Sequence, residues 1–216
     1  TVNGAEKPYL STFELGNTYD KKGKAKPRKN QSSEVLFIER IWEFLKPGTG
    51  KAAIVLPDGI LTNSSSQYVR DFILEKFQLL AVISLPKDAF AHFGAGVNAS
   101  VVFLRKKNRD EVADYDSVFM AKPQFIGYDA TGCKTIQNQL IEIASQYEKY
   151  CAGEKIDFNE ETGYLVKYNA IDNRIDVDHY SPKFIALKEK IECSNYPVVC
   201  VEDICLSIKS GFAAGK

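Results

Sequence analysis

The spacing of apolar residues changes along this chain from a helical period to short continuous runs. Over residues 34–46 the apolar side chains recur every three or four positions, which predicts an amphipathic helix. Residues 52–56 are apolar throughout and partly β-branched, which is typical of a strand buried on both faces. Two further buried strands are predicted at residues 79–85 and 98–104, and a second helix at residues 64–77 separates the first two strands. This order of elements predicts an α/β protein.

The connection between the last two predicted strands, residues 86–97, sets their relative direction. It has no helical pattern. A parallel crossover needs about a dozen residues or more and usually contains a helix, so an antiparallel pair with a long loop is predicted. Beyond it, the pattern predicts a short strand at residues 118–121 and an amphipathic helix at residues 135–150, whereas residues 1–32 are predicted to be irregular.

Pro57, Asp58 and Gly59 follow the first predicted strand and are the first candidates for a binding pocket. Pro57 has no N–H to donate and so ends the strand, and Gly59 frees the turn that follows. In an open α/β sheet, ligands bind just beyond the carboxyl ends of the strands, where this turn should lie. The alternative is a strand-ending turn in which the Asp caps its own backbone.

The loop with the sequence FAHFGAGVN, residues 90–98, contains the second set of candidates. Phe90 and Phe93 are placed to stack on an extruded nucleobase, or else to fill the core beneath a flexible loop. Asn98 stands at the start of the last predicted strand, where its amide is placed to bind a base edge. The two glycines of the loop would let the backbone approach a ligand closely.

Basic side chains gather in residues 21–29, where six of nine residues are Lys or Arg. This run is either a solvated mobile loop or a contact for phosphate groups. A smaller basic group ends the last predicted strand. The candidates for contacts with a nucleic-acid backbone are Lys21, Lys22, Lys24, Lys26, Arg28, Lys29, Lys106 and Lys107.

The composition narrows the classes of protein to consider. Lys and Arg together number 28, as do Asp and Glu, so no global charge draws the whole chain onto nucleic acid. The five cysteines include no C-x-x-C pair, which argues against a disulfide framework and against a zinc site, and no metal is predicted. No apolar stretch approaches the roughly 20 residues of a membrane helix, and no signal peptide is visible, so a cytoplasmic protein is predicted.

The strand and turn KAAIVLPDGIL, with EVLFIERIWEFLKPG before it and FGAGVNASVVFL after it, resemble a known family. Residues 9–107 are similar to the later part of the catalytic domain of adenine-N6 DNA methyltransferases, in particular the modification subunits of type I restriction-modification systems. The resemblance implies a class I, Rossmann-like methyltransferase fold, in which the three strands are the last three of a seven-stranded sheet. It also implies S-adenosylmethionine as cofactor, double-stranded DNA as substrate, and specificity and restriction subunits as partners.

Two motifs of that family do not occur here. The sequence has neither the Gly-rich F-x-G-x-G loop that binds the methyl donor nor the Asn-Pro-Pro-Phe catalytic tetrapeptide. We therefore expect no catalytic residue in this chain, which is interpreted as a piece of a longer enzyme with no donor site of its own. The strand at residues 52–56 would then have an open edge.

The resemblance divides the chain into four segments. Residues 1–32 are expected to form an irregular basic loop region, residues 33–125 a partial catalytic domain, and residues 126–173 a helical connector. Residues 174–216 look like the truncated start of a target-recognition domain, a small α+β segment, with an S-G-x-x-x-G-K turn at residues 210–216. The predicted function is that of an inactive fragment of a site-specific adenine-N6 methyltransferase; the alternative is a non-catalytic module that binds DNA or scaffolds a restriction complex.

Overall fold

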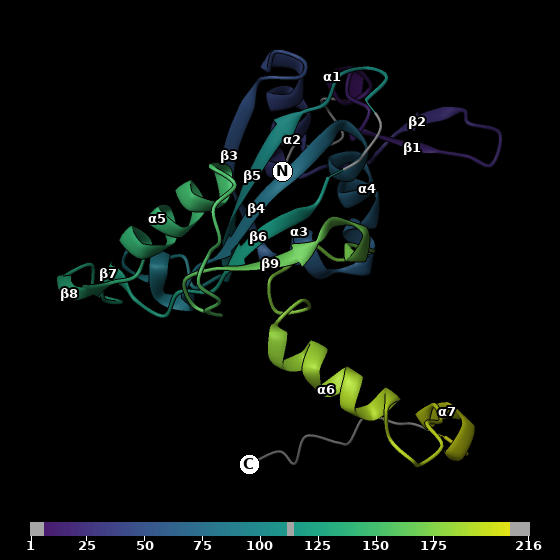
Figure 1. Cartoon of the computed structure of the whole chain (residues 1–216). Helices are drawn as coiled ribbons and strands as arrows, with labels where there is room; N and C mark the ends of the chain where they lie inside the picture. Colours follow the sequence, from purple (N-terminus) through teal and green to yellow (C-terminus); the bar gives the residue numbers. More distant parts are fainter. Residues whose placement is uncertain (1–6, 112–114, 208–216) are drawn as a thin grey trace, which may run out of the picture. The chain divides into compact units, whose positions relative to one another are not determined.

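The computed structural model describes residues 7–111 and 115–207. The chain divides into two compact units, Thr1–Tyr180 and Ser181–Lys216. The helices of the first unit are α1 (Lys7–Leu10), α2 (Ser33–Phe44), α3 (Asp58–Thr62), α4 (Gln67–Lys76) and α5 (Leu140–Cys151), with 3-10 turns η2 (Ser64–Ser66), η3 (Lys87–Phe93) and η4 (Tyr168–Ala170). Its strands are β1 (Asn17–Tyr19), β2 (Ala25–Pro27), β3 (Lys51–Pro57), β4 (Phe77–Ser84), β5 (Ala99–Lys106), β6 (Ser117–Ala121), β7 (Ile126–Tyr128), β8 (Lys134–Asn138) and β9 (Tyr164–Lys167) (Figure 1).

A mixed sheet with the strand order β3-β5-β4-β6-β9 forms the centre of the first unit. Strand β5 is antiparallel to both β3 and β4, while β6 is parallel to β4 and β9 is antiparallel to β6. The predicted antiparallel pair is therefore confirmed. Because β3, β4 and β6 run in the same direction, they all finish at one end of the sheet. We call this end the carboxyl edge, and the opposite end the amino edge.

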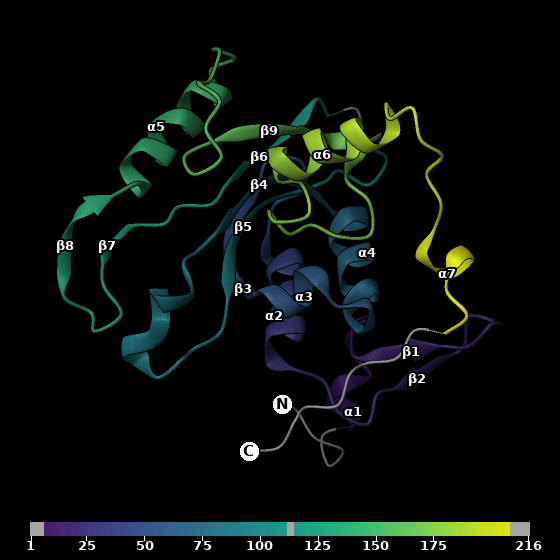
Figure 2. The ribbon, with the colours of Figure 1, turned by 90° about the horizontal axis from the view of Figure 1, so that it is seen from below.

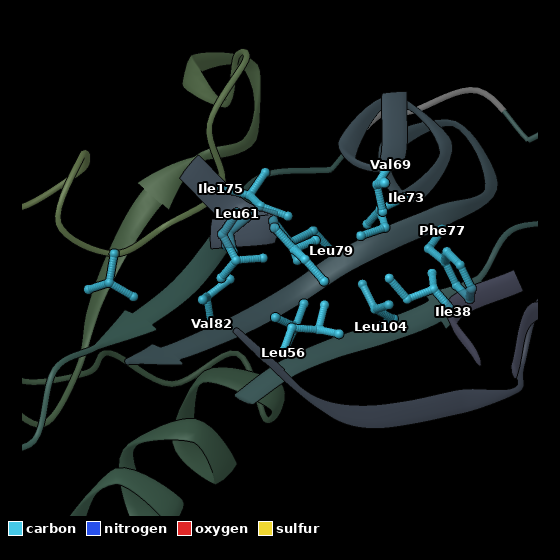
Figure 3. Packing of buried hydrophobic residues seen from close by; sticks show 14 of the residues in the cluster. Ile38, Leu56, Leu61, Val69, Ile73, Phe77, Leu79, Val82, Leu104 and Ile175 are labelled. Carbon is cyan, nitrogen blue, oxygen red and sulfur yellow. The ribbon is translucent and has the colours of Figure 1, made fainter. Parts of the chain in front are cut away.

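Helices cover the two faces of the sheet unequally. Figure 2 shows α2, α3 and α4 on one face and α5 on the other. On the first face, Leu56, Leu79 and Leu104 of the sheet pack with Ile38 of α2 and Ile73 of α4, and each of these side chains is buried (Figure 3). Such burial of apolar side chains is the main source of stability in a domain of this kind.

The burial of β3 differs from the prediction of a strand buried on both faces. Ala53 is exposed, and the side chain of Val55 keeps 50% of its surface accessible. Within the described residues β3 pairs with β5 alone, and the buried part of α5 packs against Ala81 of β4 and Phe119 of β6. The second face of β3 therefore lacks a cover, and one of its edges is open.

Other differences lie in the connections. Residues 1–32 are not irregular throughout, because β1 and β2 form a hairpin within them. The loop after β4 contains the 3-10 turn η3, and the serines at 64–66 form η2 ahead of α4. The helix predicted from residue 135 begins only at Leu140, because residues 134–138 pair with β7 as strand β8.

The second unit contains α6 (Pro182–Glu192) and α7 (Val201–Ile204). Pro182 stands in the first turn of α6, where its missing N–H is not needed. The turn expected at residues 210–216 lies outside the described residues. The assignment of this segment to a target-recognition domain stays a prediction.

Candidate functional site

The carboxyl edge brings together residues that are far apart in the sequence. Asp58 follows β3, Pro86 follows β4 and Lys122 follows β6. The carboxyl ends of strands in open α/β sheets are the usual place for ligands, because the connecting loops leave room there for a bound molecule. The sequence identified the first of these positions and missed the third.

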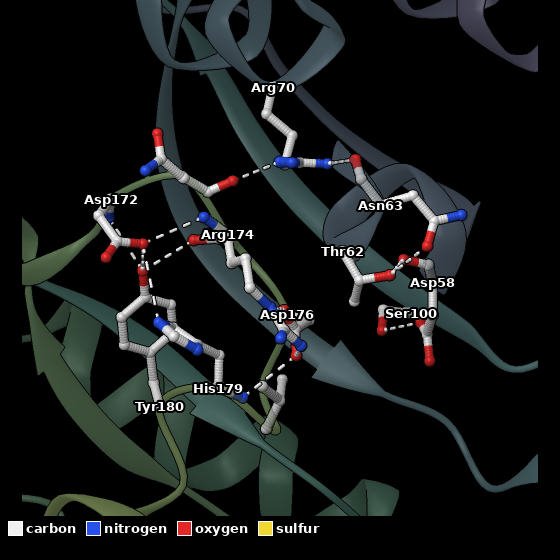
Figure 4. Close-up of polar contacts among 12 residues, drawn as sticks. Asp58, Thr62, Asn63, Arg70, Ser100, Asp172, Arg174, Asp176, His179 and Tyr180 are labelled. Atoms are coloured by element: carbon white, nitrogen blue, oxygen red, sulfur yellow. Dashed lines mark hydrogen bonds and ion pairs between the residues drawn. The ribbon is translucent and has the colours of Figure 1, made fainter. Parts of the chain in front are cut away.

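Asp58 is fixed by strand β5 through two hydrogen bonds. Its backbone N–H donates to the carbonyl of Asn98 over 3.0 Å, and the hydroxyl of Ser100 donates to its Oδ1 over 2.7 Å (Figure 4). Ser100 is 1% exposed, so its rotamer is fixed by the surrounding core. The partner of the carboxylate thus comes from the neighbouring strand, and Pro57 and Gly59 flank it as half-buried residues.

The environment of Asp58 shifts the pKa of its side chain upward. Burial raises the pKa of the Asp58 carboxyl, and the nearby carboxylates of Asp176 and Asp178 raise it further. The hydrogen bond from Ser100 and the ammonium of Lys122 act in the opposite direction, but the net shift is upward. A half-buried carboxyl with a raised pKa, at the edge where ligands bind, is a candidate functional group.

The segment 172–180 forms a wall beside this carboxyl group. Arg174 donates to both oxygens of Asp176, from Nε over 2.7 Å and from Nη2 over 2.8 Å, and Asp176 also accepts from the backbone N–H of His179. Asp176 is 5% exposed, so its charge is compensated by these three donors. Lys122 and Asp178 form an ion pair next to them.

Arg70 of α4 joins this wall to α3. Its guanidinium is 1% exposed and donates to the carbonyls of Asn173 at 2.6 Å, Ile60 at 2.7 Å and Asn63 at 2.9 Å. The bond to Ile60 is buried, and the other two, at the end of α3 and in the segment that follows β9, are part-buried. Arg70 therefore holds the helix that begins at Asp58.

The two phenylalanines of the loop at residues 90–98 have different environments. Phe90 is half-buried and lines a hollow of about 500 Å³ between β4, β5 and α5. Phe93 is 77% exposed, and its ring contacts that of His92 in a tilted arrangement with 3.8 Å between ring centroids. Asn98 is exposed. Of the two rings, Phe93 is the one that is accessible for stacking on a ligand.

The basic run does not lie at the carboxyl edge. Lys21, Lys22 and Lys24 form the exposed tip of the β1–β2 hairpin, and Lys26 and Lys29 are also exposed. Arg28 has its guanidinium 3.9 Å from the ring centroid of Tyr68 and donates to the carbonyl of Asn17. Figures 1 and 2 both place this hairpin beside the helix layer, away from η3 and the β7–β8 hairpin.

Lys106 and Lys107 lie at the amino edge and bind helix ends. Lys106 is 9% exposed and donates to the carbonyl of Trp42 in the last turn of α2, over 2.7 Å. Lys107 donates over 2.7 Å to the carbonyl of Leu74 in the last turn of α4, and burial lowers the pKa of its ammonium. Carbonyls of a last helical turn have no partner within the helix and attract cations. These two lysines are therefore not a solvated rim.

The sequence was also compared with known families. The family model for N-6 DNA methylases matches residues 5–186. This chain belongs to the N-6 DNA methylase family.

Solved structures show that this N-6 DNA methylase chain has the fold of methyltransferase subunits. The modification subunit of a putative type I restriction enzyme from Vibrio vulnificus YJ016 is 18% identical with a TM-score of 0.54, over 81% of this chain and 38% of that one. The methyltransferase subunit of a type I system from Streptococcus thermophilus is 24% identical with a TM-score of 0.50, over 72% of this chain and 31% of that one. The chain thus spans less than half of the length of either.

The apolar hollow beside Phe90 in this N-6 DNA methylase chain does not fit S-adenosylmethionine. The donor carries a sulfonium, a carboxylate and a ribose, so its pocket needs charged and polar groups. The hollow beside Phe90 is lined by apolar side chains, and Glu148 is the only charged residue among those that line it. Gly94 and Gly96 precede a strand, whereas a nucleotide-binding glycine loop follows one and opens a helix.

Two further classes of site do not occur in the part of the chain that the structure describes. No group of three or more His, Cys, Asp or Glu side chains there is arranged to hold a metal ion. None of the described helices is long and apolar enough to cross a membrane.

Several residues of the site were missed from the sequence. Arg70 gave one usable signal, because it is a charged residue in a helix whose neighbouring positions, Val69 and Phe72, face the core. Lys122 and Asp176 gave no signal, since their place at the carboxyl edge depends on β6 and on the segment after β9.

Proposed function

We propose that this chain forms the base-binding part of an adenine-N6 DNA methyltransferase, which uses S-adenosylmethionine as methyl donor. The proposal rests on family membership and on one observation, the Asp58 carboxyl held by Ser100 at the carboxyl edge of the sheet. The motifs for the donor and for catalysis do not occur in this sequence. The role of the chain is therefore to position the substrate.

Methylation of a base amine requires the base to leave the helical stack and to be held in a pocket. The exocyclic amine of adenine is a hydrogen-bond donor, and the carboxylate of Asp58 is an acceptor with lone pairs left after its bond to Ser100. Phe93 offers an exposed ring for stacking, which contributes roughly 1–3 kcal/mol per base. Asn98 is exposed and supplies an amide for a base edge.

The exposed lysines of the β1–β2 hairpin are proposed to contact the phosphate backbone. Lys21, Lys22, Lys24, Lys26 and Lys29 are all solvent-exposed, as phosphate contacts require. Arg28 faces Tyr68 and is proposed to hold the hairpin in place. Lys106 and Lys107 have their ammonium groups on helix carbonyls and are no longer proposed as DNA contacts.

A second candidate function is a non-catalytic DNA-binding or scaffolding module of a restriction complex. The apolar lining of the hollow beside Phe90, which does not fit S-adenosylmethionine, favours it. In either case the proposed partners are double-stranded DNA and the specificity and restriction subunits of such a system, in the cytoplasm.

The test compares three forms of the chain: the wild type, Phe93→Ala and Phe44→Ala. The last removes an exposed ring at the end of α2 and serves as the matched control. Fluorescence anisotropy measures binding to a duplex that contains one unpaired adenine and to the fully paired duplex. We expect the unpaired adenine to increase affinity for the wild type and for Phe44→Ala, and this increase to be lost in Phe93→Ala. Equal affinity of the wild type for both duplexes would contradict the base-binding role.

The same samples separate the two candidate functions. Incubation with DNA and isotopically labelled S-adenosylmethionine reports methyl transfer. Base-selective binding without transfer supports a substrate-positioning part of an enzyme. DNA binding without any preference for the unpaired base favours the non-catalytic module.

A further inference from the structure

A second hollow lies between the loop after β4 and the β7–β8 hairpin, and its volume is about 290 Å³. The loop contributes Pro86 and Asp88 to its lining, and the other side contributes Phe125, Tyr128 and Gln137. It differs from the apolar hollow beside Phe90, because amide, hydroxyl and carboxylate groups line it together with aromatic rings.

The hairpin that forms one wall is rigidly built. At its turn, Oδ1 of Asp129 accepts from the backbone N–H and the hydroxyl of Thr131, over 2.9 and 2.7 Å, and from the N–H of Cys133 over 3.0 Å. At its base, Oε1 of Gln139 accepts from the two backbone N–H groups of residues 124–125, over 2.7 and 3.0 Å. Both ends of the hairpin are thus fixed by side chains.

The hairpin turn is in contact with the opposite loop. Gly132 has φ +84°, and a Cβ atom there would lie only 3.0 Å from Cδ2 of His92. Only a glycine lets the turn approach the ring this closely. His92 in turn contacts the ring of Phe93, so the hairpin turn touches the loop that carries the proposed base contact.

The hairpin nevertheless buries little of its own surface. All five residues of β8 are exposed, Ile136 fully so, and Tyr128 and Phe125 keep 51% and 42% of their surface accessible. A two-stranded hairpin is marginally stable by itself. Aromatic rings held in place but left uncovered are typical of a binding surface.

The chemistry of the hollow fits a nucleobase. Phe125 and Tyr128 provide ring faces for stacking, while Gln137 and Asp88 provide donors and acceptors for a base edge. Its volume of about 290 Å³ is close to that of the smallest ligand pockets, about 300 Å³, so the hollow admits one planar ring system. We propose that it binds a second, unstacked base of the bound DNA, and this inference rests on the proposed function.

This position is distinct from the Asp58 carboxyl group. Asp58 follows β3, whereas the hollow is built from the segments that follow β4 and β6, and β5 separates β3 from β4 in the sheet. The loop at residues 87–98 lies between the two sites because it connects β4 to β5.

The first experiment maps contacts directly. A DNA duplex with single-stranded ends and 5-iodouracil substitutions is irradiated with the full 216-residue chain, and cross-linked peptides are identified by mass spectrometry. We expect cross-links at Phe125 or Tyr128. Cross-links confined to other segments would overturn this inference and leave the proposed function standing. A complete absence of DNA binding would contradict both.

The second experiment measures affinity for the same DNA. Removal of one stacking ring in Tyr128→Ala is expected to weaken binding about tenfold, whereas Phe44→Ala retains wild-type affinity. Gln137→Ala, which keeps both rings, is expected to weaken binding less. Circular dichroism checks that each variant is folded. Wild-type affinity in a folded Tyr128→Ala would overturn the proposal. If Tyr128→Ala is unfolded, Gln137→Ala decides: weaker binding supports the proposal, and wild-type affinity overturns it.

Discussion

The pKa values of two acidic side chains, Glu111 at the amino edge and Asp58 at the carboxyl edge, shift in opposite directions. At the amino edge, Arg105 pairs with Glu111, and Lys106 binds a helix carbonyl. The bond from Arg105 lowers the pKa of Glu111 to about 2. At the carboxyl edge, burial raises the pKa of Asp58, and Ser100 is the neutral donor that holds it. Donors at the amino edge favour the ionised form of Glu111, whereas burial at the carboxyl edge opposes the ionisation of Asp58.

The largest effect is expected from removing the residue that supports the carboxyl edge. Arg70→Ala removes the donor from the buried bond to the carbonyl of Ile60 and from the part-buried bonds to the carbonyls of Asn173 and Asn63. We expect a loss of about 3 kcal/mol or more in the free energy of unfolding. Urea denaturation measures it, and Arg40→Ala, a half-exposed arginine of α2, is the control with an expected loss below about 1 kcal/mol. Equal losses in the free energy of unfolding for the two variants would show that the Arg70 hydrogen bonds do not stabilise the fold more than a half-exposed arginine does.

A smaller effect is expected from removing the donor to Asp58. Ser100→Ala is expected to destabilise the fold by about 1–2 kcal/mol and to raise the pKa of Asp58 further, because the ionised carboxylate loses its bond. Ser84 faces Ser100 across the β4–β5 pair, and Ser84→Ala is the matched control. The pKa of Asp58 is followed by NMR titration of its carboxyl carbon. An unchanged pKa in Ser100→Ala would show that Ser100 does not position the carboxylate.

The opposite pKa shifts at the two edges predict opposite pH dependences. Glu111 contributes stability above its ordinary pKa, and this is lost as the pH falls toward about 2, so Glu111→Gln destabilises the chain near neutral pH and not in acid. Asp58 has a raised pKa, so its ionisation costs stability at neutral pH and the cost vanishes as the pH falls. Asp58→Asn is therefore expected to stabilise the chain near neutral pH. Unfolding curves from acidic to neutral pH measure the change in the free energy of unfolding for both variants. A change of the same sign for Glu111→Gln and Asp58→Asn near neutral pH would contradict the predicted difference between the two edges.

The smallest effect concerns long-range attraction of DNA. The double variant Lys22→Ala and Lys24→Ala removes two exposed ammonium groups from the β1–β2 hairpin. We expect weaker DNA binding at low salt. The slope of log affinity against log salt concentration should become shallower by about one for each phosphate group that the variant no longer neutralises. The same salt dependence, measured for Lys134→Ala, shows how a lysine of the β7–β8 hairpin compares with those of the β1–β2 hairpin. An unchanged slope in the double variant would remove the β1–β2 hairpin from the DNA interface.

The sequence predicted the elements whose pattern is local and long. The pattern predicted helix α2, strands β3, β4 and β5, and the antiparallel pairing of β4 with β5. It also placed Asp58 at the end of a strand. The β1–β2 hairpin was not, since its strands have only three residues each. Strand β8 was assigned to the following helix because Ile136 continues the helical spacing of Leu140 and Ile143.

The candidate site depended more on distant contacts. Arg70 and its partner Asn173 are 103 positions apart, and no local pattern reports such a bond. Lys106 and Lys107 were placed correctly at a strand end, but their role follows from the carbonyls of α2 and α4 that lie there. The exposure of Phe93 and the burial of Phe90 were equally open until η3 fixed the loop.

The most direct test of the account maps where DNA meets the sheet. In a chain labelled with ¹³C and ¹⁵N, NMR signals are followed while a duplex with one unpaired adenine is added. The account predicts that Asp58, Phe93 and Ser100 shift, and that Glu111 and Lys106 at the amino edge do not. Shifts centred on the amino edge, or equal shifts with a fully paired duplex, would contradict the claim that the carboxyl edge holds the extruded base.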